Sequence, residues 1–136
     1  EVERTVDDYA RTARLAREAG YDGVEIMGSE GYLINEFIAA RTNHRTDRWG
    51  GSYENRMRFP VEIVRRVREA VGEDFIVVYR LSMLDLVPGG SSLDEVITLA
   101  RAVEAAGRPS STPASAGTRR ASPPSPPPCR AAPTPG

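Results

Sequence analysis

The chain has 136 residues, a formal net charge of −1 and one cysteine, Cys129. The balanced charge argues against a nucleic-acid partner, and a lone cysteine excludes a disulfide framework and predicts no metal site. No signal peptide and no apolar run of membrane-spanning length is present, so we expect a cytoplasmic protein with no membrane partner.

The composition changes abruptly after Gly107. The 29 residues from 108 to 136 hold nine of the eleven prolines and contain no Ile, Leu, Val, Phe, Tyr or Trp. Such a segment cannot bury enough apolar surface to offset the entropy that ordering would cost. We therefore expect one folded unit over residues 1–107 and a disordered tail over residues 108–136.

The first predicted element is a helix that runs from Thr5 to Gly20. Thr5 and Asp8 have the spacing of a capping box, and glycine is the usual residue just past the end of a helix. The apolar run Gly23–Met27 is typical of a buried strand, and residues 32–39 can form one or two helical turns.

Residues 40–52 are polar and predict a loop. Ser52 can cap a helix that extends to Gly72, in which Pro60 either introduces a kink or restarts the helix at its first position. The apolar stretch Phe75–Leu81 is the clearest strand of the chain.

A loop over residues 84–92 leads to the last predicted helix, Leu93–Ala106. Helices thus alternate with two strands that are too apolar to be half-exposed, which favours parallel strands covered by helices. This pattern fits both a doubly wound sheet and a (β/α)8 barrel. No glycine-rich phosphate loop follows either strand, and this absence argues against a dinucleotide-binding unit.

Polar side chains gather just past the expected ends of both strands. Ser29, Glu30 and Tyr32 follow the first strand, and Arg80 and Ser82 stand at the end of the second. This placement suits a barrel, which builds its site at the carboxyl ends of strands. The tyrosine could donate a proton and the arginine could bind an anion or cofactor; the alternatives are a buried structural tyrosine and a structural ion pair.

Three separated motifs occur in the order EIMGSEGYLINEF, RTNHRTDRWGGSYENRMRFPVEIVRRVREAVG and YRLSMLDLV. Over residues 5–107 they resemble the flavin-dependent Old Yellow Enzyme superfamily, and more closely its bacterial NADPH-dependent 2,4-dienoyl-CoA reductases. The resemblance implies an FMN-bearing (β/α)8 barrel, of which this chain would be a central section. It also implies reduction of a conjugated C=C in an acyl-CoA, with a hydride from reduced FMN and a proton from an acid.

The resemblance assigns roles to four residues of this chain. Tyr32 matches the family's proton donor, and Arg80 matches the strand-end arginine that contacts FMN and stabilises its reduced, anionic form. Met27 and Glu30 stand near the substrate, where many members carry a His–His or His–Asn pair that holds a carbonyl oxygen. This departure favours the dienoyl-CoA branch, which also carries FAD and an iron–sulfur cluster in parts that this chain lacks.

The tail calls for a separate interpretation. In that family a further strand and a histidine-bearing motif follow the position of Gly107. A shift of one base turns each TCN serine codon of the tail into a codon that ends in TC, which encodes Phe, Leu, Ile or Val. We therefore expect residues 108–136 to be an out-of-frame translation and the chain to be an inactive internal fragment. The alternative is a small interaction protein whose SPPSPPP segment binds an SH3- or WW-like domain as polyproline II.

Overall fold

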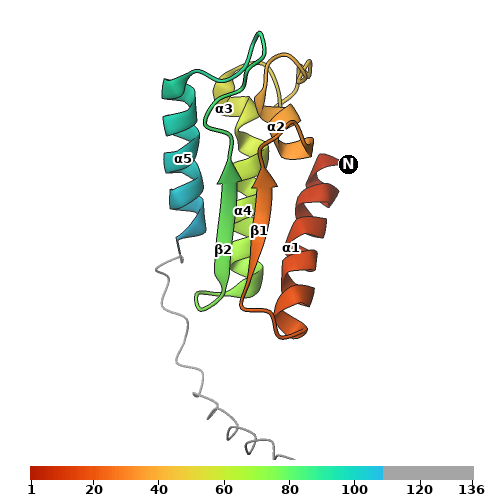
Figure 1. The fold of residues 1–136 in the computed structure, drawn as a ribbon. Coiled ribbons are helices and arrows are strands. Elements are labelled where there is room, and N and C mark those ends of the chain that lie inside the picture. The colour runs from red at the N-terminus through yellow and green to blue at the C-terminus, as the bar shows by residue number, and fades with distance from the viewer. Residues whose placement is uncertain (109–136) are drawn as a thin grey trace, which may run out of the picture.

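A computed structural model describes residues 1–108 of the chain. Its elements are α1 (Val2–Glu18), β1 (Gly23–Gly28), α2 (Leu33–Ile38), α3 (Tyr53–Arg56), α4 (Arg58–Val71), β2 (Ile76–Leu81) and α5 (Leu93–Gly107), which Figure 1 shows. The two strands pair in parallel, so the predicted alternation and strand direction are confirmed. The expected disorder and reading frame of the tail concern residues 109–136, which lie outside the described part, and Arg108 caps the end of α5.

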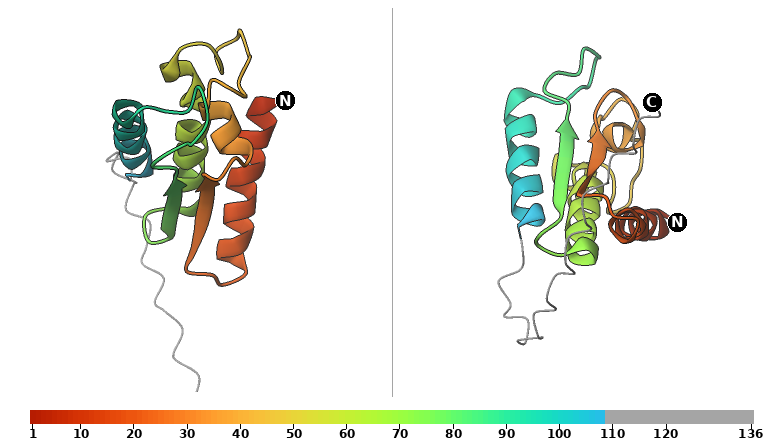
Figure 2. Two further views of the ribbon diagram at one scale, coloured as in Figure 1. Left: turned by 45° about the horizontal axis from the view of Figure 1, so that its top comes forward. Right: turned by 60° about the horizontal axis from the view of Figure 1, so that its bottom comes forward.

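The sheet carries its helices on one face. Figure 1 views the strands from the open face, with α4 behind them, and both views of Figure 2 place α4 between α1 and α5. The core lies between the strands and these helices, where Val6, Ile26, Ile63 and Val67 are buried. Within residues 1–108, no helix is both long enough and apolar enough to cross a bilayer.

The expectation that both strands are buried on both faces is wrong for the described residues. Ile76 and Val78 of β2 are 59% and 48% exposed, whereas Val77 and Tyr79 pack against the core. The apolar run places hydrophobic side chains on both faces because consecutive strand residues point to opposite sides. The described helices cover only one of those faces, so the other is an open surface with apolar side chains.

The predicted capping box at Thr5 is also wrong. The first helix, α1, begins at Val2, and the Thr5 hydroxyl donates instead to the Glu1 carbonyl oxygen at 3.3 Å, inside the helix. A Thr–Asp pair three residues apart also fits an ordinary helical turn, so its spacing alone does not locate the start. The predicted end is confirmed: Gly20 has a φ of +91° and donates its N–H to the Arg17 carbonyl oxygen.

The helix predicted to run from Ser52 to Gly72 is divided at Met57 into α3 and α4. Ser52 caps α3 as predicted, because its side chain accepts the Asn55 N–H at 3.4 Å. Pro60 lies at the third position of α4 rather than the first. Its missing N–H costs nothing there, since the first four N–H groups of a helix have no intrahelical partner.

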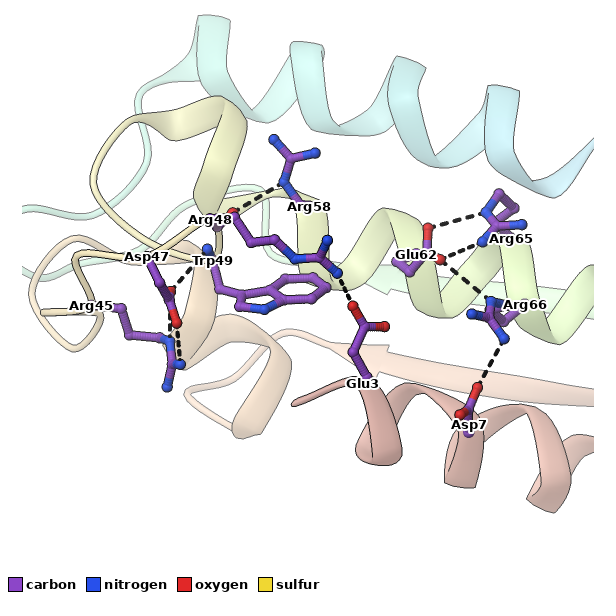
Figure 3. Close-up of polar contacts among 10 residues, drawn as sticks. All are labelled: Glu3, Asp7, Arg45, Asp47, Arg48, Trp49, Arg58, Glu62, Arg65 and Arg66. Atoms are coloured by element: carbon purple, nitrogen blue, oxygen red, sulfur yellow. Dashed lines mark hydrogen bonds and ion pairs between the residues drawn. The ribbon is translucent and has the colours of Figure 1, made fainter. Parts of the chain in front are cut away.

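The 40–52 loop is held against α4 and α1 by its tryptophan and a neighbouring arginine (Figure 3). Trp49 is buried, and its ring meets that of Phe59 edge-on at a centroid distance of 6.2 Å. The Arg48 guanidinium lies 4.6 Å from the centre of the indole ring and pairs with Glu3 of α1. These contacts give the long polar loop a defined position next to α2.

Candidate functional site

The loops that follow β1 and β2 leave the same edge of the sheet, because parallel strands end on the same side. Gly28 pairs with Leu81 at that edge, and one residue earlier Met27 pairs with Arg80. The carboxyl ends of the strands therefore bring together residues that lie about fifty positions apart in sequence, as a barrel site requires.

Arg80 forms an ion pair with two glutamates on the open face of the sheet. Its Nε lies 2.8 Å from Glu25 Oε1, and its Nη1 lies 3.2 Å from Glu30 Oε1. The hydrogen bond to Glu25, followed by the one to Glu30, raises the pKa of Arg80, so the guanidinium stays charged. Both pairs leave Nη2 without a partner among residues 1–108, and the side chain is 46% exposed.

Tyr32 occupies the N-cap position of α2 and is 59% exposed. The alternative of a buried structural tyrosine is therefore wrong for the described residues. The backbone N–H of Tyr32 donates to the Ser29 carbonyl oxygen at 3.3 Å, which closes the turn between β1 and α2. The phenol is thus carried by a hydrogen-bonded turn at the carboxyl end of β1 and remains open to solvent.

This turn contains two successive residues in the left-handed region. Glu30 has a φ of +63° and Gly31 a φ of +76°. The left-handed region disfavours side chains with a Cβ, so Glu30 adopts it at an energetic cost that surrounding contacts must offset. The resulting sharp change of direction points the Glu30 carboxylate towards Arg80 and starts α2 at Leu33.

Met27 and Ser29 lie close to these residues. Met27 is half-buried and lies beside Arg80 in the strand register, while Ser29 is 4% exposed. The Ser29 hydroxyl approaches the Met27 sulfur at 3.6 Å. Ser82, by contrast, does not join Arg80, because its hydroxyl donates to Asp85 at 2.8 Å.

Two polar residues that the sequence analysis does not single out meet at the same edge. Asn35 is 6% exposed, and its Oδ1 accepts the Gly31 N–H at 2.8 Å. Its Nδ2 lies 3.4 Å from Asp85 Oδ1, which also accepts the hydroxyl of Ser82. The available sequence signal was an amide on the apolar side of a short helix, where a buried polar group needs partners.

A groove of about 430 Å³ opens between the loops after β1 and β2. Leu84, Leu86 and Val87 give it an apolar side, and Glu30 and Asp85 contribute carboxylates. A second cavity of similar volume lies between the start of α1 and the 40–52 loop, away from the predicted site residues. Of the residues that the sequence analysis places at the strand ends, Glu30 and Ser82 line this groove.

The family model of the NADH:flavin oxidoreductase / NADH oxidase family matches residues 1–116. The chain belongs to this family, the Old Yellow Enzyme family. The predicted superfamily is therefore confirmed. The comparisons give no support to the alternative of a small interaction protein, and the SPPSPPP segment on which it depends lies outside the described residues.

Curated relatives share close to half of their residues with this chain. The NADH oxidase of Thermoanaerobacter brockii is 46% identical over 107 residues, which make up 79% of this chain and 16% of that protein. A probable NADH-dependent flavin oxidoreductase of Bacillus subtilis is 47% identical over 107 residues, or 76% of this chain and 29% of that protein. The chain thus spans less than a third of the length of either relative.

Solved structures give the same result. A 2-naphthoyl-CoA reductase in complex with 2-naphthoyl-CoA matches with a TM-score of 0.76 and 44% identity, over 79% of this chain and 16% of that one. An Old Yellow Enzyme homologue from Zymomonas mobilis matches with a TM-score of 0.70 and 39% identity, over 78% of this chain and 30% of that one. These neighbours are barrel enzymes, so the predicted fold class, a section of a (β/α)8 barrel, is confirmed.

Proposed function

We propose that residues 1–107 form the section of an FMN-dependent NAD(P)H oxidoreductase that presents an arginine to FMN and a proton-donating tyrosine to the substrate. The observation that carries this proposal is the position of the Arg80 guanidinium on the open face of the sheet, where it pairs with Glu30 of the turn that also carries the exposed phenol of Tyr32. Membership of a flavin oxidoreductase family supports the choice of cofactor.

The residues on the open face fit a flavin by their chemistry. Met27 and Val78 offer apolar surface next to Arg80, which suits the ring system of an isoalloxazine. The unpartnered Nη2 of Arg80 can donate to an electron-rich edge of that ring, where a fixed cation stabilises negative charge. When bound, FMN would supply the hydride for reduction of the substrate.

Tyr32 would supply the proton. A phenol is a competent general acid when it lies within hydrogen-bond reach of the atom that it protonates. Its place at the N-cap of α2 keeps the phenol at the mouth of the strand ends, while Glu30 of the same turn pairs with Arg80. The turn that carries Tyr32 is thus linked to Arg80 through the Glu30 carboxylate.

For the substrate we propose a conjugated acyl-CoA, of the 2,4-dienoyl-CoA class. Two observations support this class: the Met27 and Glu30 positions depart from the His-containing pair of simple enone reductases, and a structural neighbour at 44% identity is a CoA-ester reductase in complex with its CoA substrate. By this proposal the whole enzyme uses NADPH and carries FAD and an iron–sulfur cluster in parts outside this chain.

A chimera tests the proposal. Residues 1–107 replace the homologous segment of the Thermoanaerobacter brockii NADH oxidase, to which this chain is 46% identical. We expect the chimera to purify with bound flavin, to oxidise NADH, and to reduce a 2,4-dienoyl-CoA faster, relative to cyclohexenone, than the parent enzyme does. A folded chimera without flavin would overturn the proposed cofactor site, and an unchanged ratio of the two substrates would overturn the proposed substrate class.

A further inference from the structure

We propose that Asn35 and Asp85 are positioning residues for Tyr32. Asp85 fixes the orientation of the Asn35 side-chain amide. The oriented amide then restrains the backbone of the β1–α2 loop, which presents the Tyr32 phenol at the strand ends. The contribution to catalysis rests on the proposed function, whereas the contact network itself rests on the geometry of residues 1–108.

The network runs from one loop to the other through a buried amide. Asn35 Oδ1 accepts the Gly31 N–H at 2.8 Å, and Asn35 Nδ2 lies 3.4 Å from Asp85 Oδ1. Gly31 directly precedes Tyr32 and has a φ of +76°. The bond to Asn35 therefore restrains the backbone at the residue before the phenol and next to Glu30, whose left-handed conformation needs external support.

The carboxylate of Asp85 decides which way the amide of Asn35 points. An ionised carboxylate only accepts hydrogen bonds, so the NH2 group of Asn35 has to face it. The carbonyl oxygen of the same amide is then directed at the Gly31 N–H, which needs an acceptor. A reversed amide would place two acceptors against each other at Asp85 and two donors against each other at Gly31.

Asp85 is itself tied to the strand that carries Arg80. It accepts the hydroxyl of Ser82, two residues after Arg80, at 2.8 Å, and the Ser91 N–H approaches its second oxygen at 3.5 Å. The loop closes tightly around it: a Cβ on Gly90 would lie 2.7 Å from Asp85 Cβ. Asp85 thus links the turn after β1, which carries Tyr32, to the segment that follows β2.

The simplest competing explanation is that Asn35 only stabilises the start of α2. A structural role of that kind would lower stability in every variant that breaks the network and would slow both halves of the catalytic cycle. A positioning role would slow the step that uses the Tyr32 proton and leave reduction of the flavin by NADH intact. The two roles therefore separate in half-reaction measurements.

An exchange of the two side chains provides the sharpest test. Asn35→Asp alone opposes two carboxylates, and Asp85→Asn alone removes the group that orients the amide. In the double variant Asn35→Asp/Asp85→Asn, residue 35 can still accept the Gly31 N–H. The new NH2 group at residue 85 can donate to residue 35 and to the Ser82 hydroxyl oxygen, and the new amide oxygen can accept the Ser91 N–H. Asp94→Asn on the exposed start of α5 is the matched control for the chemical change.

In the flavin-loaded chimera we expect each single variant to slow flavin reoxidation by the dienoyl-CoA about tenfold, because each loses one charge-assisted hydrogen bond. The rate of flavin reduction by NADH should not change in the single variants, and the double variant should recover most of the reoxidation rate. Neither single variant should slow reoxidation further when it is combined with Tyr32→Phe. Equal slowing of both half-reactions, or effects that multiply with Tyr32→Phe, would overturn the proposal.

Amide hydrogen exchange of the full 136-residue chain gives a readout that does not depend on flavin. Protection of the Gly31 amide should fall in Asp85→Asn, return in the exchanged pair and stay unchanged in Asp94→Asn. Unaltered protection in Asp85→Asn would show that Asp85 does not orient the amide. A chimera that lacks flavin while this pattern holds would contradict the proposed function and leave the network supported.

Discussion

Arg80 and Glu30 join the ends of the two strands, with 3.2 Å between Nη1 of the guanidinium and Oε1 of the carboxylate. Glu30 reaches this position from a left-handed backbone conformation, and Glu25 holds the other side of the guanidinium at 2.8 Å. The arginine is therefore oriented by its own neighbours before any ligand binds, which lowers the cost of ordering a flexible side chain on binding.

Removal of this cation should weaken the flavin site. We expect Arg80→Ala in the chimera to lower the flavin content or to slow flavin reduction by NADH, because the fixed positive charge beside the reduced ring is lost. Absorbance spectra and stopped-flow reduction measure both quantities. Arg101→Ala, an exposed residue of α5, is the charge-matched control and should resemble the unmodified chimera. An unchanged flavin content and reduction rate in Arg80→Ala would refute the role of this residue.

Removal of the Tyr32 hydroxyl should affect only proton donation. In Tyr32→Phe we expect flavin reduction by NADH to persist and turnover of the dienoyl-CoA to fall, since the ring remains and only the acid is lost. Tyr21→Phe removes the same hydroxyl from another exposed tyrosine and should have no effect on either step. If both half-reactions of Tyr32→Phe slow equally, the tyrosine is structural.

The edge of the sheet leaves no room for a side chain at Gly28. An added Cβ would lie 2.2 Å from the Cζ and the hydroxyl of Tyr79, whose ring packs against the core. We expect Gly28→Ala to lower the free energy of unfolding of the 136-residue chain by about 1–3 kcal/mol, measured by denaturant titration. Gly107→Ala is the control: its Cβ would lie 3.5 Å from Val64 Cγ1, an ordinary contact, so stability should not fall.

The chain of 136 residues should not be an active enzyme by itself. A barrel site takes its contacts from the ends of several strands, and residues 1–108 contribute β1 and β2. We expect the purified chain to be colourless and to show no NADPH oxidation when FMN and a dienoyl-CoA are added. A yellow protein that oxidises NADPH would show that two strands suffice for the site.

The gene offers a test of the tail that needs no protein. We propose that one base is missing near codon 107, so that residues 108–136 are read out of frame. Resequencing should reveal one additional base near codon 107. Translation in the restored frame should then continue with an apolar strand and further family-like sequence. An early stop codon in that frame, or a sequence unrelated to the family, would contradict the frameshift.

Much of the fold could be predicted from the sequence because it depends on neighbours a few residues apart. The apolar runs at Gly23–Met27 and Phe75–Leu81 became β1 and β2, and Gly20 ended α1 through its positive φ. Polar residues just past the strands marked the edge at which Tyr32 and Arg80 stand. The start of α1 was missed, since a Thr–Asp spacing is the same at the start of a helix and within it.

The tertiary structure alone decided which distant groups meet. Asn35 and Asp85 lie fifty residues apart, and the position of Asn35 on the apolar side of α2 says that it needs a partner but not which one, so their contact arises only when the two strand ends are paired. The partners of Arg80 and the burial of Trp49 were settled in the same way. Periodicity and capping are short-range properties, whereas ion pairs and buried amides depend on where packing places whole strands and helices.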